Sequence, residues 1–483
     1  MSRLSKTVVH YYVHLFVLCL FTIGVVCSKF LMSMGILIGI LNLIFEGNYI
    51  AYFSNIRSNK FFIAVSVFYV LHLLGMFWTS DLLSGLDDLK SKATLVLVPF
   101  IVIARPLVLR KSYKQIVLIF LISMFITSLI NFIVYHFFES AFDFKDARDM
   151  SLFNSHIRYA VMVAFTLPLL YDLYLDSKKI RFFLFFMGIW FLFYTFSSQV
   201  LTGVISIAAI GVALILYPLL RHKKYMSFML FISSGLIICS LIYVGLKSNI
   251  SYEKPPKVDV ESVAKAWQKR SDLAYNGKDA RSQELKYTLA RFLDSKKYPN
   301  SGIGVNSLST EEVIAIEQGM AHTSEMQGGF MGRIEGLRYQ LSHMSDPNGH
   351  SLLQRFEAWK VGWSIYLDNP LKGVGTGDLN NAFKSKYAAL DTKLTEKNQI
   401  RAHNTFLTSA ITFGFFGLIT FLYLLFASVR VQLYNHNMSG FIFWTIMFVT
   451  FFFEDTLETQ TGLTLFAFFL ALFSLQIPRP SMD

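Results

Sequence analysis

Residues 116–137 read IVLIFLISMFITSLINFIVYHF, a stretch without a single Asp, Glu, Lys or Arg. A helix of about 20 apolar residues crosses the hydrocarbon core of a bilayer, so this stretch predicts a membrane-spanning helix. The same pattern recurs along the chain of 483 residues, of which 54% are apolar and 16% charged. Soluble domains hold about 25% charged residues. The composition therefore excludes a soluble enzyme, a disordered protein and a nucleic-acid-binding module, and it predicts an integral membrane protein.

Apolar runs long enough to cross a bilayer recur from one end of the chain to the other, which predicts an all-α polytopic fold with about 12 transmembrane helices. The run 93–109 is interrupted by Arg105-Pro106, so its boundaries are the least regular. The predicted spans are 9–27, 29–46, 61–78, 93–109, 116–137, 156–175, 181–197, 199–220, 225–247, 404–429, 438–454 and 461–477.

The distribution of Lys and Arg between alternate loops predicts the orientation, because cytoplasmic loops carry the excess of these residues. With the N-terminus inside, the short outer loops hold only Lys29, Lys90, Lys92, Lys145 and Arg148. The cytoplasmic segments then hold Arg3, Lys6, Arg57, Lys60, Arg105, Arg110, Lys111, Lys114, Lys178, Lys179, Arg181, Arg221, Lys223, Lys224, Arg430 and Arg479. We therefore expect both termini in the cytoplasm and an even number of spans.

One long polar segment, residues 248–402, interrupts this pattern and lies outside by the same topology. A loop of that length within a compact protein is usually functional. We therefore divide the chain into transmembrane helices 1–9 (residues 1–247), a large extracytoplasmic loop domain (residues 248–402) and transmembrane helices 10–12 (residues 403–483).

The loop is predicted to be mostly helical. Ser309 and Glu312 form a capping box that opens a helix through about Met320. Residues 279–295 carry apolar side chains at helical spacing. A third helix begins at Ser351 and ends before Asn369-Pro370. Its apolar stripe is expected to pack onto the membrane domain and consists of Leu352, Phe356, Trp359, Trp363 and Tyr366.

The best candidate for a chemical site is the segment Arg401-Ala402-His403-Asn404, where the loop returns to the membrane. An imidazole titrates near neutral pH, so His403 at the lip of a span can take a proton from a hydroxyl group. The simpler interpretation is that Arg401 and His403 only anchor the end of the helix. Other features at the same face favour a site.

Further polar features converge on the outer face. Arg158, with His156, stands at the predicted start of a span, where a cation is costly unless it is paired or functional. Residues 369–378 form a Gly-rich turn containing Lys372 that can aim backbone N–H groups at an anion or can be a plain tight turn. Residues 454–460 carry three acids that are either solvated or orient a cation or a His.

Three motifs in this order resemble the bacterial O-antigen ligase and O-antigen polymerase superfamily, and so does the multi-span layout with a large outer loop late in the chain. The motifs are Arg355-x-x-x-Trp359, Asn369-Pro370 followed by Gly373-x-Gly375-x-Gly377, and Arg401-x-His403-Asn404-x-x-Leu407. The chain also departs from the family, whose members often carry a Ser-Arg pair at the opening of a middle span. Here Ser197-Ser198-Gln199 stands instead. If that Arg binds the donor phosphate in the family, this chain must use another cation, such as Arg158.

The resemblance implies a GT-C-like inverting glycosyltransferase on the outer face of the bacterial inner membrane. The implied donor is a glycan on a polyprenyl pyrophosphate, with undecaprenyl as the expected lipid. The implied acceptor is a hydroxyl of lipid A core, of another glycan or of a protein. No metal or cofactor is expected, and the chain should contact membrane lipids and no nucleic acid. The resemblance makes His403 and Arg401 the candidate catalytic residues, and the candidate substrate-binding residues are Arg355, Arg158, Asn404, Lys372 and His156.

Several alternatives stay open at the level of the sequence. An O-antigen ligase, an O-antigen or exopolysaccharide polymerase and a protein O-oligosaccharyltransferase share the same donor chemistry. A peptidoglycan-polymerase-like enzyme shares the layout. A transporter or flippase is a more distant alternative, because transporters tend to show internal repeats and charges near the bilayer midplane, and neither is visible here.

Overall fold

The computed structural model describes residues 3–138, 141–142, 144, 146–176, 178–229, 259–280, 283–326, 347–348 and 351–475. These residues form helices joined by turns, and no β-strand occurs among them. Eight helices of the described part are long and apolar enough to cross a membrane, which makes this a multi-pass membrane protein. They are α1 (Arg3–Cys27), α2 (Lys29–Glu46), α4 (Lys60–Gly75, extended by the 3₁₀ turn Met76–Trp78), α7 (Pro106–Phe137), α8 (His156–Asp176), α9 (Arg181–Ser197), α10 (Leu201–Arg221) and α20 (Thr405–Tyr434).

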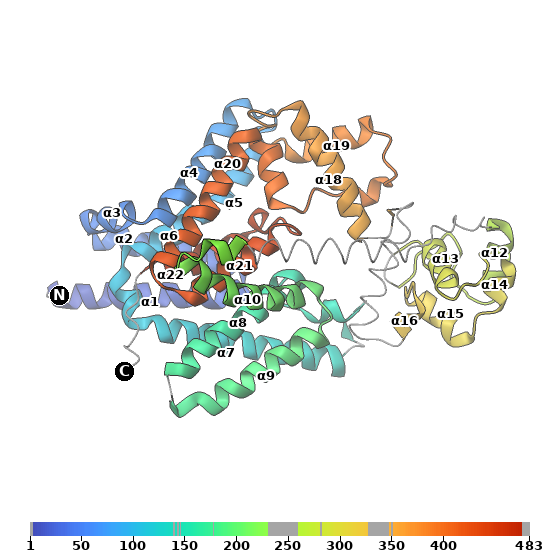
Figure 1. Cartoon of the computed structure of the whole chain (residues 1–483), viewed down its shortest axis with the longest axis horizontal. Coiled ribbons are helices and arrows are strands. Elements are labelled where there is room, and N and C mark those ends of the chain that lie inside the picture. Colours follow the sequence, from blue (N-terminus) through green and yellow to red (C-terminus); the bar gives the residue numbers. More distant parts are fainter. Residues whose placement is uncertain are drawn as a thin grey trace.

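Three further apolar helices are shorter than a full span: α6 (Thr94–Ala104), α21 (Met438–Thr450) and α22 (Gln460–Ser474). Helix α22 is buried along nearly its whole length and contacts α1, α4, α6, α20 and α21. A helix that is apolar on every side is stable only inside a core. These helices therefore form the centre of the bundle, which the longer helices surround (Figure 1). Most of the predicted span 225–247 lies outside the described residues. The structure describes only residues 225–229 of it.

The predicted span 93–109 is wrong as a single helix. Helix α6 ends at Ala104, Arg105 has non-helical angles (φ −126°, ψ 67°), and α7 begins at Pro106. A proline disfavours helical angles in the residue before it and fits well at the first helical position, so the chain breaks there. Arg105 is fixed at the break, because its guanidinium lies 2.9 Å from the Glu46 carboxylate.

The small helices of the large loop form a separate body with its own hydrophobic core (Figure 1). They are α12 (Val260–Trp267), α13 (Leu285–Ser295), α14 (Gly302–Asn306), α15 (Thr310–Glu317) and α16 (Thr323–Met326). The predicted capping box is present, with Ser309 and Glu312 each bonded to the other's backbone N–H. Helix α13 begins at Leu285, later than predicted, and it buries Leu289 and Phe292 as expected.

Helix α18 (Ser351–Asp368) has the predicted bounds, but its buried face differs from the predicted stripe. Val361 and Ile365 are buried on it, whereas Trp363 is 55% exposed. The reason is close packing: a Cβ added at Gly362 would lie 3.0 Å from Ile411 of α20, so the small residues Ala358 and Gly362 set the contact. Helix α19 (Leu379–Ala389) packs beside α18, and α3 (Tyr49–Arg57) and α5 (Leu82–Lys92) complete the helices.

Helix α20 lies beside α4 and is broken at Gly414, whose angles are φ 64° and ψ −147° (Figure 1). The chain after α18 inserts at this break. The Phe415 N–H donates to the Pro370 carbonyl at 2.7 Å, and the N–H groups of Val374 and Gly375 donate to the Ile411 and Thr412 carbonyls. The unwound turn of α20 thus exchanges its own helical bonds for bonds to this inserted segment.

We expect Gly414→Ala to destabilise the protein. Its backbone region is essentially restricted to glycine, which costs another residue about 1–3 kcal/mol, and a Cβ there would lie 2.3 Å from the Leu371 carbonyl. Gly211→Ala in α10 is the matched control, because nothing lies within 4 Å of its added Cβ. Thermal unfolding in detergent should show a lower midpoint for Gly414→Ala only. Equal midpoints for the two variants would contradict the role of the break.

Candidate active site

The segment Arg401–Asn404 is held in place at the point where the large loop enters α20. The Trp359 indole donates to the Ala402 carbonyl at 2.7 Å, and the Thr405 N–H donates to the Phe451 carbonyl at 2.9 Å. Asn404 caps α20 by accepting a hydrogen bond from the Leu407 N–H. His403 has φ 45°, a left-handed conformation that is uncommon for a residue other than glycine. Such backbone strain persists only where the surrounding structure imposes it.

Glu454, from the turn between α21 and α22, lies between His403 and Arg158. Its carboxylate oxygens are 3.8 Å from Nδ1 of His403 and 3.4 Å from Nη2 of Arg158. The Glu454 side chain is only 9% exposed, so these interactions act in a site with little water. One acid of this turn therefore lies close to both an imidazole and a guanidinium group contributed by distant parts of the chain.

The environment of His403 favours its neutral form. Burial lowers the pKa of the imidazole below its ordinary value of 6.5, and the nearby guanidinium groups of Arg355, Arg401 and Arg158 lower it further. Glu454 acts in the opposite direction and raises it. The net shift is downward, so the ring is neutral at pH 7 and is able to accept a proton.

Arg355, on α18, is half-buried and has no carboxylate within ion-pair distance in the described part of the chain. Burial lowers the pKa of its guanidinium, and the charges of Glu454 and Asp455 oppose that shift. A desolvated cation without a direct counter-ion is costly. Arg355 is therefore the cation here that most needs a bound anion.

A second acid of the same turn, Glu458, collects two further cations. The Lys92 ammonium donates to the Glu458 carboxylate and, at 2.7 Å, to the Leu457 carbonyl. The Arg401 guanidinium lies 3.7 Å from Glu458, and Asp88 lies 3.7 Å from Lys92. Lys92 is only 2% exposed, so helix α5 is joined to the turn between α21 and α22 by buried charges.

The charge states in this second group follow from its contacts. Burial alone would lower the pKa of Lys92, but Glu458 and Asp88 hold it above its ordinary value, so the ammonium stays charged. Burial would likewise raise the pKa of Glu458, but Lys92 and Arg401 hold it below its ordinary value. Burial raises the pKa of Asp88 to about 6, against the opposing charge of Lys92.

A cavity of about 610 Å³ opens beside this region, between α8, α10, α13 and α18. Glu454 and Arg355 line it, together with His156. Arg401, His403, Arg158 and Lys372 are not among its lining residues. The remaining wall includes Gln199 and the cations Arg148, Arg291 and Lys397.

The Gly-rich turn is structural. The N–H groups of Gly373, Val374 and Gly375 donate to backbone carbonyls, and that of Gly377 donates to the Thr79 hydroxyl at 3.0 Å. These groups are therefore already occupied and do not form an anion cradle. Gly373 has φ 68°, and a Cβ there would lie 2.4 Å from the backbone of α20, so glycine is required for the close approach.

The other predicted site residues are placed as follows. Lys372 is exposed on the Gly-rich turn, away from the cavity. The Asn404 amide is used by the helix cap and by a bond to the Phe452 carbonyl at 3.3 Å. His156 lies at the cavity wall at the start of α8. The roles of these residues toward a substrate remain predictions.

Sequence reasoning missed Lys92 and Asp88. Each lies in a short outer loop next to an apolar run, where charged residues normally flank a span and face water. The four-residue spacing of Asp88 and Lys92 on α5 was a weak signal of a pair on one helix face. Their meeting with Glu458 depends on a contact across more than 360 residues of chain.

Comparison with known families gives one match over residues 182–422, to the family described as O-antigen ligase. The matched segment runs from α9 into α20 and contains Arg355, Arg401 and His403. Glu454, Glu458 and Lys92 lie outside it. No curated protein matches this chain.

Lys92→Met should destabilise the protein strongly, because removing one partner of a buried ion pair typically costs about 3–5 kcal/mol. The double variant Lys92→Met/Glu458→Gln should lose less than the sum of the two single changes, since it leaves no unpaired charge. Thermal unfolding in detergent measures all three. Lys90→Met, on the exposed side of α5, is the matched control and should change little. An unfolding midpoint for Lys92→Met equal to that of the control would refute the structural role of the pair.

Proposed function

Because the chain belongs to the O-antigen ligase and O-antigen polymerase superfamily, a family of membrane glycan-processing proteins, we propose that it is an inverting, GT-C-like glycosyltransferase. Its donor is a glycan on a polyprenyl pyrophosphate. Its acceptor is a hydroxyl group of lipid A core, of another glycan or of a protein. The reaction takes place at the outer face of the bacterial inner membrane. The observation that carries the proposal is that Glu454 contacts both His403, at 3.8 Å, and Arg158, at 3.4 Å, and lines a cavity together with the half-buried Arg355.

In the proposed reaction, an acceptor hydroxyl oxygen attacks the anomeric carbon of the donor sugar. The bond from that carbon to the pyrophosphate oxygen breaks, and the lipid pyrophosphate leaves with the bonding electrons. Nε2 of His403 takes the hydroxyl proton. The lowered pKa of His403 supports this role, because the ring is unprotonated at pH 7 and ready to act as a base.

Arg355, Arg158 and Arg401 are the proposed ligands of the pyrophosphate. A guanidinium fork matches the geometry of phosphate oxygens and binds two of them at once. Arg355 has no ion-pair partner among the described residues, and Nε of Arg158 is buried without a hydrogen-bond partner there. Both groups would gain from an anion. The cavity beside Glu454 is within the roughly 300–1,000 Å³ of small-molecule sites, so it suits the sugar residues of a substrate.

Glu454 is proposed as a positioning residue. Its carboxylate faces Nδ1 of His403 at 3.8 Å, so it favours the tautomer that carries the proton on Nδ1 and leaves the lone pair on Nε2. It also stabilises the imidazolium ion that forms when the proton is taken. Such contacts often shorten when the substrate is bound.

His403→Ala should lower glycan transfer by roughly 10²–10⁴-fold, the usual cost of removing a general base, with donor binding retained. His403→Gln keeps a polar group of similar size but cannot accept the proton, so it should be as inactive. Both variants, placed in a strain that lacks the native gene, are scored by surface glycan and by transfer with purified protein. A His403→Gln protein that transfers glycan at a near wild-type rate would show that His403 is not the general base.

The same strain separates the three acceptor classes. Loss of all long chains on lipid A indicates a ligase, and products limited to one repeat unit indicate a polymerase. Underglycosylated proteins indicate a protein transferase. If the strain that lacks the gene has the same lipid A chains, polymer lengths and protein glycosylation as its parent, the proposed function is refuted.

Glu454→Gln should shift the acid limb of the pH profile of kcat/KM to lower pH. The active form of His403 is neutral, so activity falls as the pH drops through its pKa, and Glu454 raises that pKa. Removing the carboxylate lowers the pKa further, while the rate at neutral pH also falls because the ring loses its orienting partner. Glu261→Gln, an exposed change on α12, is the matched control. A profile of Glu454→Gln with an unmoved acid limb would show that Glu454 acts only on packing.

A further inference from the structure

A second cavity, of about 540 Å³, lies at the opposite end of the bundle from His403. Residues at the ends of α4, α7, α20 and α22 form its wall. Helix α20 runs from Thr405, beside His403, to Tyr434 at this cavity. Beyond its break at Gly414, residues 415–434 of α20 span roughly 30 Å at about 1.5 Å per residue, which is about the thickness of the hydrocarbon core, so the two cavities lie toward opposite faces of the membrane domain.

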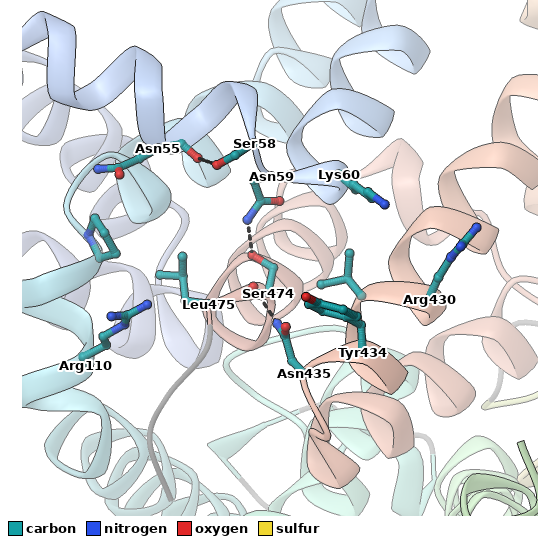
Figure 2. Close-up of a pocket in the computed structure, with 12 residues that line it drawn as sticks. Asn55, Ser58, Asn59, Lys60, Arg110, Arg430, Tyr434, Asn435, Ser474 and Leu475 are labelled. Carbon is teal, nitrogen blue, oxygen red and sulfur yellow. Dashed lines mark hydrogen bonds between the residues drawn. The ribbon is translucent and has the colours of Figure 1, made fainter. Parts of the chain in front are cut away.

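The floor of this cavity is built from hydrogen-bonded amides and a hydroxyl (Figure 2). Nδ2 of Asn59 donates to Oγ of Ser474 at 2.8 Å, while its Oδ1 accepts from the Phe62 N–H and caps α4. Nδ2 of Asn435 donates to the Ser474 carbonyl at 2.7 Å. These bonds join three helices, so the shape of the cavity is set before any ligand arrives.

Three cations from three helices line the same cavity: Lys60 of α4, Arg110 of α7 and Arg430 of α20 (Figure 2). No Asp or Glu is among the lining residues. None of the three has a carboxylate within ion-pair distance in the described part of the chain. The Arg430 guanidinium lies 5.9 Å from the centre of the Phe426 ring, on its own helix.

The three side chains are exposed, so an anion that enters the cavity meets positive charge that no carboxylate in its lining neutralises. A phosphate group suits the cavity, because guanidinium groups bind it through charged hydrogen bonds and the Asn and Ser side chains add neutral ones. The cations also stand at the ends of membrane-spanning helices, at the depth of lipid headgroups. Basic pockets between spans at this depth are suited to anionic lipid headgroups.

We propose that this pocket, formed by Lys60, Arg110, Arg430, Asn59, Asn435 and Ser474, binds the phosphate group of an anionic phospholipid headgroup. The ligand chemistry is a phosphate mono- or diester, and free phosphate esters of the cytoplasm share it. The site is separate from the transfer site and does not depend on the proposed function.

The test uses the full-length protein in nanodiscs or micelles and measures its affinity for labelled phosphatidylglycerol. The variant Lys60→Gln/Arg110→Gln/Arg430→Gln removes the three cations of the pocket. The matched control is Arg57→Gln/Lys111→Gln/Arg221→Gln, which removes the same types of residue from exposed positions outside the pocket. Each cation near an anionic lipid contributes about fivefold in affinity. The pocket variant should therefore bind phosphatidylglycerol roughly 100-fold more weakly than the unchanged protein, and the control variant should bind it more tightly than the pocket variant does.

Two further arms identify the source of the phosphate. Phosphatidylcholine should bind far more weakly than phosphatidylglycerol, since it has no net charge. If glycerol 3-phosphate or inorganic phosphate competes with the labelled lipid at similar affinity, the pocket takes a free phosphate group, and if neither competes, it takes the lipid. If the triple variant does not fold, the single variant Arg430→Gln replaces it and should bind phosphatidylglycerol about fivefold more weakly than the unchanged protein. Equal affinity of the pocket and control variants for phosphatidylglycerol would overturn the proposal.

Discussion

Charges buried at the end of a membrane bundle need counter-charges, and the end of this protein that carries His403 is organised by that requirement. The turn between α21 and α22 supplies two acids, Glu454 and Glu458, which contact Lys92, Arg158, Arg401 and His403 from three other segments. Breaking a buried ion pair is costly, because it leaves a charge without compensation. Helices α5 and α8 and the return of the large loop are therefore held to one turn, and the imidazole of His403 is placed by the same contacts.

The partition of these charges has a chemical consequence. Glu458 neutralises Lys92 and part of Arg401, so these groups mainly hold the turn between α21 and α22 in place. Glu454 is shared between His403 and Arg158, and Arg355 stands close by without a direct partner in the described residues. In the proposed reaction, the excess positive charge would bind the anionic leaving group, while the neutral imidazole would serve as the base.

The break in α20 connects this site to the rest of the fold. The Gly-rich segment after α18 forms backbone bonds with the unwound turn at Gly414, which fixes α18 against α20. Arg355 and Trp359 stand on α18, and Trp359 bonds to Ala402, next to His403. The glycines of residues 369–378, for which the sequence left open an anion-binding turn or a plain tight turn, therefore act indirectly, by setting the position of the helix that carries Arg355.

The sequence by itself determined the membrane-spanning class, most helix bounds and the segment that returns to the membrane at His403. These features are local: in lipid the backbone must satisfy its own hydrogen bonds, so hydropathy along a single stretch is enough to predict a helix. The capping box at Ser309 is equally local. The family resemblance also came from short motifs, and the match over residues 182–422 agrees with it.

Only the tertiary structure decided which charges meet. Lys92 and Glu458 are separated by 366 residues, and either could equally have faced water at the lip of its span. It also decided which face of α18 is buried: Ala358, Val361, Gly362 and Ile365 are buried, whereas Trp363 of the predicted aromatic stripe is 55% exposed. Contacts of this kind depend on how distant helices pack, and no local pattern of residue types encodes that geometry.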